Sequence, residues 1–320
     1  MKPLLKHLKY LSILTSLCFG QATFASVEEG LAWTQQGEWW EAEPLFLEEA
    51  EKGNPEAMFW LAKTQMRMGG ERIFTLGRWM EESAEQGNPW AMIELVDGPN
   101  TYCSFFMLPC DDKWFDKAIE KWQQLAANGD GKAMYMLAKH KDTWRKYVPY
   151  LAHRTRVAQY EQALEMGANR AAIALYNELS RHQDIKDPAI REQAIGYLKI
   201  AAERGYAPAM VELSSLYQSD KDKSLLYLKT ALSLGYPEAA SVLAGNYYLK
   251  DNRTKSEWEE FYKYAKILFE LGDSFYDYQL KGNYFKSALP TETIAELDQE
   301  IEDFLTKVKP NRFYDETNLY

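Results

Sequence analysis

The sequence is poor in the residues that metal and nucleophilic chemistry need. It contains four histidines and three cysteines in 320 residues. Beyond residue 25 the histidines are His140, His153 and His182, whose separations of 13 and 29 residues fit no metal-ligand pattern. The sequence also lacks a G-x-S-x-G elbow, an H-E-x-x-H pair and the glycine-rich phosphate loops. We therefore predict a protein without catalytic residues, without a bound metal and without a cofactor.

Long apolar runs are missing as well, apart from one near the amino terminus. Lys2, Lys6 and Lys9 precede an apolar run over 11–20, and the short stretch 22–25 follows it. This layout is typical of a secretory signal peptide, and the run is shorter than the about 20 residues that a membrane-spanning helix needs. We expect cleavage after residue 25, export to a bacterial periplasm and no stable membrane insertion.

Basic residues are fewer than acidic ones. The chain has 37 Lys and Arg against 47 Asp and Glu, which gives a formal net charge of −10. Removal of residues 1–25 would remove three lysines and no acid, and would change this charge from −10 to −13. Nucleic acids and anionic membranes demand a basic face, so we exclude both as partners. The charge suits a cationic protein partner, although an acidic balance also serves solubility alone.

A phrase with a central glycine recurs along the chain. Clear copies read EKGNPEAM, EQGNPWAM, NGDGKAM, ERGYAPAM and SLGYPEAA. The copies are anchored, at intervals of 30 to 42 residues, by Gly53, Gly87, Gly129, Gly167, Gly205, Gly235 and Gly272. Such intervals are typical of a helix-turn-helix repeat. The glycine ends one helix because it tolerates positive φ, and the proline of GNP and GYP begins the next helix.

Apolar positions keep a fixed register to each glycine. Leucine stands eight residues after it in every copy, and alanine stands four residues after it in six of seven, with Tyr276 as the exception. The side chain seven residues before it is always apolar. Alanine lets two helices approach closely, and the leucine on the same face fills the seam between neighbouring pairs. The register predicts stacked units. Each unit consists of the helix before the glycine, named helix B, the glycine turn, and the helix after the glycine, named helix A.

The phrase A-E-Q-G-N-P-x-A, with leucine four residues after the alanine, resembles the Sel1-like repeat family, a relative of the tetratricopeptide repeats. That family often carries tyrosine four residues past the leucine, which this chain matches at Tyr217, Tyr247 and Tyr284 but not at Gln65, Pro99 and Lys141. The resemblance covers about residues 28–285. It implies an all-α, right-handed superhelical solenoid of about seven stacked antiparallel helix pairs.

The predicted organisation has four parts: a signal peptide at 1–25, the repeats at 26–289, a capping helix at 290–309 and a tail at 310–320. The capping helix is indicated by apolar residues spaced three or four apart, namely Ile294, Leu297, Ile301, Phe304 and Val308. Thr293 and Glu296 predict a capping box at its start. We expect the tail to be either loose or docked on the repeats.

An insertion over 97–112 lengthens the third repeat. It contains Cys103 and Cys110, which we expect to form a disulfide in an oxidising compartment, the alternative being two free thiols. Between and beside them lie the aromatic residues Tyr102, Phe105 and Phe106. We interpret these side chains either as a plug packed on the repeats or as a surface presented to a partner.

Two tryptophans are further candidates for partner binding. Trp60 and Trp90 stand directly before seam positions of helix A, where their side chains could face a concave groove. Aromatic residues on such a surface are natural anchors for another protein.

The resemblance implies a function in protein binding, because helical solenoids offer a long concave surface. Exported Sel1-like proteins resemble antidotes to lipase toxins of the type VI secretion system, so our specific hypothesis is an immunity protein that neutralises a cationic toxin. The first alternative is an accessory scaffold for an envelope machine, with a secretion-machine subunit as its partner. The second is a cell-wall hydrolase, which would need clustered titratable side chains that the sequence does not show.

Overall fold

The computed structural model describes four ranges of the chain, 26–97, 110–140, 149–182 and 186–317. Every regular element within these ranges is a helix, which confirms the predicted all-α class. The chain divides into two compact units, unit 1 with residues 1–122 and 316–320, and unit 2 with residues 123–315.

Unit 1 consists of helices that pack on their neighbours in sequence. After a first helix over 26–36 come α2 (Trp39–Glu51), α3 (Pro55–Met68), the 3-10 helix η1 (Gly70–Arg72), α4 (Ile73–Glu85) and α5 (Pro89–Glu94). Helix α2 packs on α3, α3 on α4, and α4 on α5. Helix α6 (Lys113–Ala127) runs across the boundary between the units.

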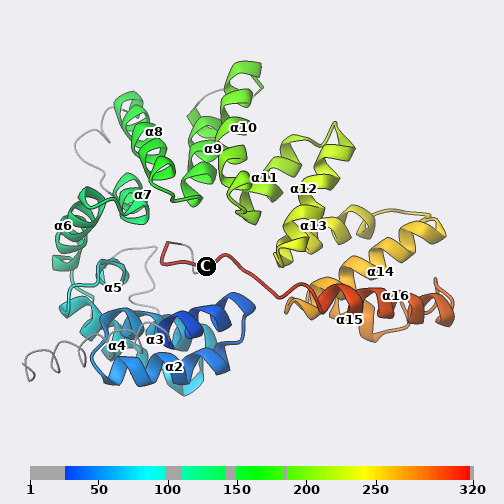
Figure 1. Cartoon of the computed structure of the whole chain (residues 1–320), viewed down its shortest axis with the longest axis horizontal. Helices are drawn as coiled ribbons and strands as arrows, with labels where there is room; N and C mark the ends of the chain where they lie inside the picture. Colours follow the sequence, from blue (N-terminus) through cyan, green and yellow to red (C-terminus); the bar gives the residue numbers. More distant parts are fainter. Residues whose placement is uncertain (1–25, 98–109, 141–148, 183–185, 318–320) are drawn as a thin grey trace, which may run out of the picture. The chain divides into compact units, whose positions relative to one another are not determined.

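Unit 2 also consists of helices that pack on their neighbours in sequence (Figure 1). Its helices are α7 (Gly131–His140), α8 (Pro149–Glu165), α9 (Arg170–His182), α10 (Pro188–Glu203), α11 (Ala207–Leu216), α12 (Lys221–Ser233), α13 (Pro237–Tyr248), α14 (Lys255–Glu270), α15 (Asp277–Lys281) and α16 (Thr291–Leu305). Each helix from α7 to α14 packs on the next, and α11 also touches α9 and α13. Neighbouring pairs are therefore stacked, as the register predicts.

The turn glycines adopt the predicted conformation. All seven have a positive φ, between +79° and +97°. Side chains with a Cβ rarely adopt this region, so glycine ends helix B there at little cost. In the first two copies the next residue, Asn54 or Asn88, caps helix A by accepting backbone N–H groups through its side-chain oxygen. Proline follows as the first residue of α3 and of α5.

The seam positions are buried as predicted. The alanines and leucines after the first six glycines are all buried, and so are all seven residues that stand seven positions before a glycine. The seventh copy departs from the pattern. Tyr276 replaces the alanine and is buried, whereas Leu280 lies in the short helix α15 and stays half-exposed. The last repeat is thus completed by a five-residue helix rather than a full helix A.

Helix α16 packs against α14, in agreement with its predicted amphipathic pattern. The Tyr262 hydroxyl donates a hydrogen bond to Asp298 Oδ1 at 2.6 Å. The predicted capping box at Thr293 is wrong, because the helix already begins at Thr291, behind Pro290. A capping box does occur at α14, where Thr254 and Glu257 exchange hydrogen bonds.

Unit 1 buries a charged pair between two of its helices. Lys63 Nζ on α3 lies 2.9 Å from Glu94 Oε1 on α5, and the lysine side chain is 2% exposed against 21% for the glutamate. Burial lowers the pKa of Lys63, and the charge of Glu94 opposes this change. Removal of the carboxylate would leave an ammonium group inside the protein without that compensating charge.

We predict that Glu94→Ala lowers the free energy of unfolding by about 2 kcal/mol, a value reduced from that of a fully buried pair because Glu94 is partly exposed. Adding Lys63→Met should restore most of the loss, because the uncompensated charge is then gone. Chemical denaturation of Glu94→Ala and of the double variant measures both effects. Glu48→Ala, which removes a carboxylate from an exposed pair with Lys52, serves as the control and should change stability by less than about 0.5 kcal/mol. Equal losses for the Glu48 and Glu94 variants would contradict the prediction.

Candidate binding groove

The carboxyl-terminal segment of unit 2 returns along the repeats. Helix α16 ends at Leu305, and residues 308–315 continue without regular secondary structure. In Figure 1 this red segment passes the ends of α13 and then α11. The contacts below place it on the glycine turns of successive repeats. The predicted tail is therefore docked at residues 310–315, and we give the name tail groove to the surface that it contacts, which comprises the turns at Gly205, Gly235 and Gly272 and the Arg170 side chain.

One contact of the segment is with the end of α14. The Arg312 guanidinium donates hydrogen bonds to the carbonyl oxygens of Leu271, at 3.1 Å, and Gly272, at 3.2 Å. Carbonyl groups at the end of a helix lack partners within the helix and carry partial negative charge. The Arg312 guanidinium gives these carbonyl groups hydrogen-bond donors and also places a positive charge beside their partial negative charge.

Gly235 allows the segment to come close to the next turn. The backbone N–H of Asn311 donates to the Gly235 carbonyl oxygen at 2.9 Å. A Cβ at Gly235 would collide with the carbonyl group of Lys309. The Asn311 side chain then accepts a hydrogen bond from the backbone N–H of Phe313 at 3.1 Å. This local turn presents the Phe313 side chain to the groove.

Phe313 is wedged between two tyrosines. Its ring meets those of Tyr206 and Tyr236 edge to face, with both pairs of ring centroids 5.7 Å apart. Burial raises the pKa of Tyr206, and burial followed by the charges of neighbouring groups raises the pKa of Tyr236 to about 12. Both phenols are thus neutral at physiological pH. Each edge-to-face pair contributes about 0.5 to 1.5 kcal/mol beyond the burial of its surface.

These two tyrosines occupy the capping position of the repeat. Asn54, Asn88 and Asp130 stand directly after the turn glycines of the first three copies, and each accepts a backbone N–H of the following helix. Tyr206 and Tyr236 stand at the same position before α11 and α13 and make no side-chain cap hydrogen bond. In these two repeats the residue after the glycine contacts Phe313 instead of capping the helix.

A cationic side chain lies toward the end of the tail groove. Arg170, the first residue of α9, donates from Nε to the Tyr135 hydroxyl at 3.2 Å. Burial disfavours its charge, but the neighbouring Tyr135, Tyr206 and Asp315 outweigh this and raise the pKa of Arg170. The groove thus sets the Asp315 carboxylate near a fixed positive charge. Arg312 and Asp315 give the segment a defined direction along the repeats.

A second polar cluster joins α8 and α9. Glu178 accepts hydrogen bonds from Arg156, and its Oε2 lies 3.3 Å from His153 Nδ1. Both His153 and Glu178 are buried. Another histidine, His140, has its pKa lowered to about 4, mainly by burial. His153, Arg156 and Glu178 join α8 to α9, and in the described ranges no group of three or more His, Cys, Asp or Glu could hold a metal ion.

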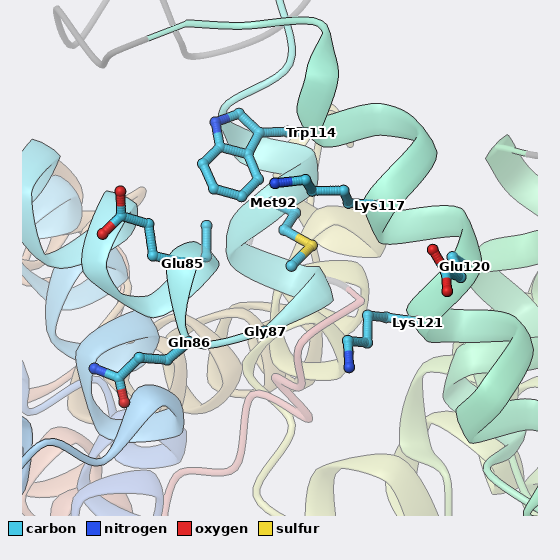
Figure 2. A pocket seen from close by; sticks show the side chains of 9 residues that line it. Glu85, Gln86, Gly87, Met92, Trp114, Lys117, Glu120 and Lys121 are labelled. Atoms are coloured by element: carbon cyan, nitrogen blue, oxygen red, sulfur yellow. The ribbon is translucent and has the colours of Figure 1, made fainter.

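Figure 2 shows a surface pocket of about 310 Å³ in unit 1, between the Gly87 turn and α6. Trp114 and Met92 are buried at its wall, and Lys117 Nζ lies 4.8 Å from the centre of the Trp114 ring. Its charged side chains are exposed lysines and glutamates. This lining gives a shallow polar depression without a serine, threonine, cysteine or histidine among its nine residues.

The structure places the predicted tryptophan anchors in the core of unit 1. Trp60 is 1% exposed and lies against Phe46 and Phe59, with ring centroids 6.2 and 5.5 Å away. Trp90 is 9% exposed and packs on Trp122 at 5.4 Å. The expectation that both indoles face a groove is corrected by their burial, since α3 is buried along ten consecutive residues, Ala57 to Met66, and α5 along four, Pro89 to Met92.

The remaining predicted site residues belong to the insertion. Tyr102, Cys103, Phe105 and Phe106 lie outside the described residues. The disulfide between Cys103 and Cys110 and the partner surface on this loop stay predictions. Sequence reasoning missed Tyr206, Tyr236 and Phe313, although the change from GN to GY at two turns was a visible signal.

No protein-family model matches the chain, and no curated protein matches it. Several solved structures are similar, and two of them are the following. The first is c5321, a protective antigen present in uropathogenic Escherichia coli strains and displaying an SLR fold, at 16% identity and a TM-score of 0.42, covering 87% of this chain and 68% of that one. The second is Pseudomonas aeruginosa 5086 (PA5086), at 19% identity and a TM-score of 0.46, covering 68% and 81% respectively.

The stacked helix pairs and the glycine register of the described residues define a helical repeat protein. Along those residues, no helix combines the length and the apolar character needed to cross a bilayer.

We predict that Phe313→Ala releases the segment from the tail groove, because the ring supplies its aromatic contacts with both tyrosines. Trypsin cannot cut after Lys309, which precedes proline, but it can cut after Arg312. Cleavage after Arg312 under native conditions should become about tenfold faster, which corresponds to about 1.4 kcal/mol of lost docking energy. Mass spectrometry of timed digests measures the rate. Phe74→Ala, which truncates an exposed phenylalanine of unit 1, is the matched control and should leave the rate unchanged. The prediction fails if both variants digest like the unmodified chain.

Proposed function

We propose that this chain is a non-enzymatic protein-binding scaffold. One observation carries the proposal: the glycine turns of successive repeats in unit 2 form a row that holds an extended polypeptide segment, the chain's own tail. The fold thus supplies what peptide recognition requires, namely backbone carbonyl groups, an aromatic wedge and a fixed charge. The buried ionisable groups support the same reading, because His153, Glu178 and Lys63 take part in contacts that join helices.

We further propose that the protein acts after export, with cleavage of residues 1–25. The lysines before the apolar run and the small residues after it support this proposal. As the specific role we propose immunity, in which the scaffold binds and neutralises a toxin-type enzyme. The excess of acidic residues supports a cationic partner, and the Sel1-like repeat pattern supports the antidote class.

We predict that the protein purified from an osmotic-shock extract of a bacterial host begins at Ser26. Amino-terminal sequencing or the mass of the intact chain measures this directly. The control is Ala25→Lys, which places a long charged side chain at the cleavage position and should retain the uncut precursor. Recovery of the full-length chain from the cytoplasmic fraction for both forms would contradict export.

We predict that the tagged, processed chain copurifies from its native host with one stoichiometric protein partner. The mass of the complex gives the stoichiometry, and mass spectrometry identifies the bound protein. Inhibition of a toxin-type enzyme on binding would support the immunity role. Copurification of secretion-machine subunits would instead support the scaffold role and contradict the immunity role. Turnover of cell-wall material by the purified chain would overturn the non-enzymatic proposal.

A further inference from the structure

The tail groove holds its present occupant through contacts that a short peptide can reproduce. They include two hydrogen bonds from Arg312 to carbonyl groups, one backbone hydrogen bond from Asn311 and the edge-to-face contacts of Phe313. The side chains from Asn311 to Asp315 all remain partly exposed. Much of the binding of such an occupant comes from its covalent connection to α16, which keeps it at a high effective concentration beside the groove.

The occupant is also strained. Phe313 has a φ of +54°, in the left-handed region that bulky side chains rarely adopt. Backbone strain of this kind persists only where the surroundings enforce it, and it is concentrated at binding sites and switch regions. A segment that placed the same ring between Tyr206 and Tyr236 without positive φ would bind with less strain. The groove is thus better matched to a different segment of the same chemistry.

The groove selects a direction as well as an aromatic residue. The carbonyl groups at the end of α14 accept the Arg312 guanidinium, while Arg170 lies near Asp315 at the other end. A segment running the opposite way would bring a basic side chain toward Arg170. Electrostatic complementarity therefore requires a basic residue before the aromatic one and an acidic residue after it.

We propose that the tail groove is the site where unit 2 binds an extended segment of its protein partner. The segment carries an aromatic residue that enters the wedge between Tyr206 and Tyr236, a basic residue directly before it and an acidic residue two positions after it. Residues 309–315 are then a built-in competitor that the partner displaces. This inference rests on the proposed protein-binding function and names its surface and the chemistry of the bound segment.

The test uses the full chain and a fluorescent peptide with the sequence of residues 309–317, KPNRFYDET. Fluorescence anisotropy should show the peptide binding to the Phe313→Ala chain about tenfold more tightly than to the unmodified chain, because the competitor is weakened. Adding Tyr236→Ala should reduce this binding at least about tenfold, whereas Tyr278→Ala, which truncates an exposed tyrosine of the same unit, should not.

Two altered peptides keep the test independent of protein folding. One has alanine in place of phenylalanine, and the other has the reversed sequence; both should bind at least about tenfold more weakly. Absence of peptide binding to a Phe313→Ala chain with an unchanged circular dichroism spectrum would overturn the inference. Equal binding of the forward and reversed peptides would overturn it too.

The partner complex separates this inference from the proposed function. Excess peptide should release the partner from the complex, and Tyr236→Ala should weaken the complex by about tenfold. A complex that resists both changes leaves the protein-binding function intact and overturns only the assignment of the groove. A concentration-dependent dimer that disappears in the Phe313→Ala chain would show that each tail binds the groove of another copy. The occupant of the groove would then be a second copy of this chain and not a different protein.

Discussion

The turn that joins helix B to helix A is the constraint on which the rest of the structure depends. A glycine with positive φ ends one helix, and the backbone enters the next within two residues. Four residues later an alanine without bulk allows close packing of the helices, and the following leucine fills the seam. Because the same turn recurs, the residues directly after the glycines of unit 2 are set out along successive helix starts. The tail groove is a consequence of this regularity.

The fold could be predicted because its determinants are local and repeated. A glycine, an alanine and a leucine at fixed separations specify a turn and a seam wherever they occur, and the burial of Ala209 and Leu213 follows the same rule as that of Ala57 and Leu61. The prediction weakened where the repetition ends. The seventh copy replaces the alanine by Tyr276, and the short helix α15 results. The start of α16 was misplaced because Pro290 provides the boundary without any side-chain cap.

The candidate site was harder to predict because its contacts join distant parts of the sequence. Phe313 meets Tyr206 across more than one hundred residues, and no periodic pattern specifies that pairing. The tryptophan hypothesis failed for a related reason. Helical periodicity marks one buried face, but α3 lies between α2 and α4 and is buried on more than that face, so that even Lys63 and Thr64 are enclosed. A position beside the seam is therefore not evidence of an exposed groove in such a helix.

The two turn tyrosines link the stability of unit 2 to the occupancy of its groove. An asparagine or aspartate cap stabilises a helix start by about 1 kcal/mol, and α11 and α13 lack this contribution. Each tyrosine instead makes an edge-to-face pair with Phe313, which contributes a similar amount, about 0.5 to 1.5 kcal/mol. An occupied groove thus offsets the missing caps, and an empty groove leaves both helix starts weaker. A ligand that binds only the folded state stabilises it by mass action. Replacement of capping residues by tyrosines makes these two repeats depend on an aromatic occupant.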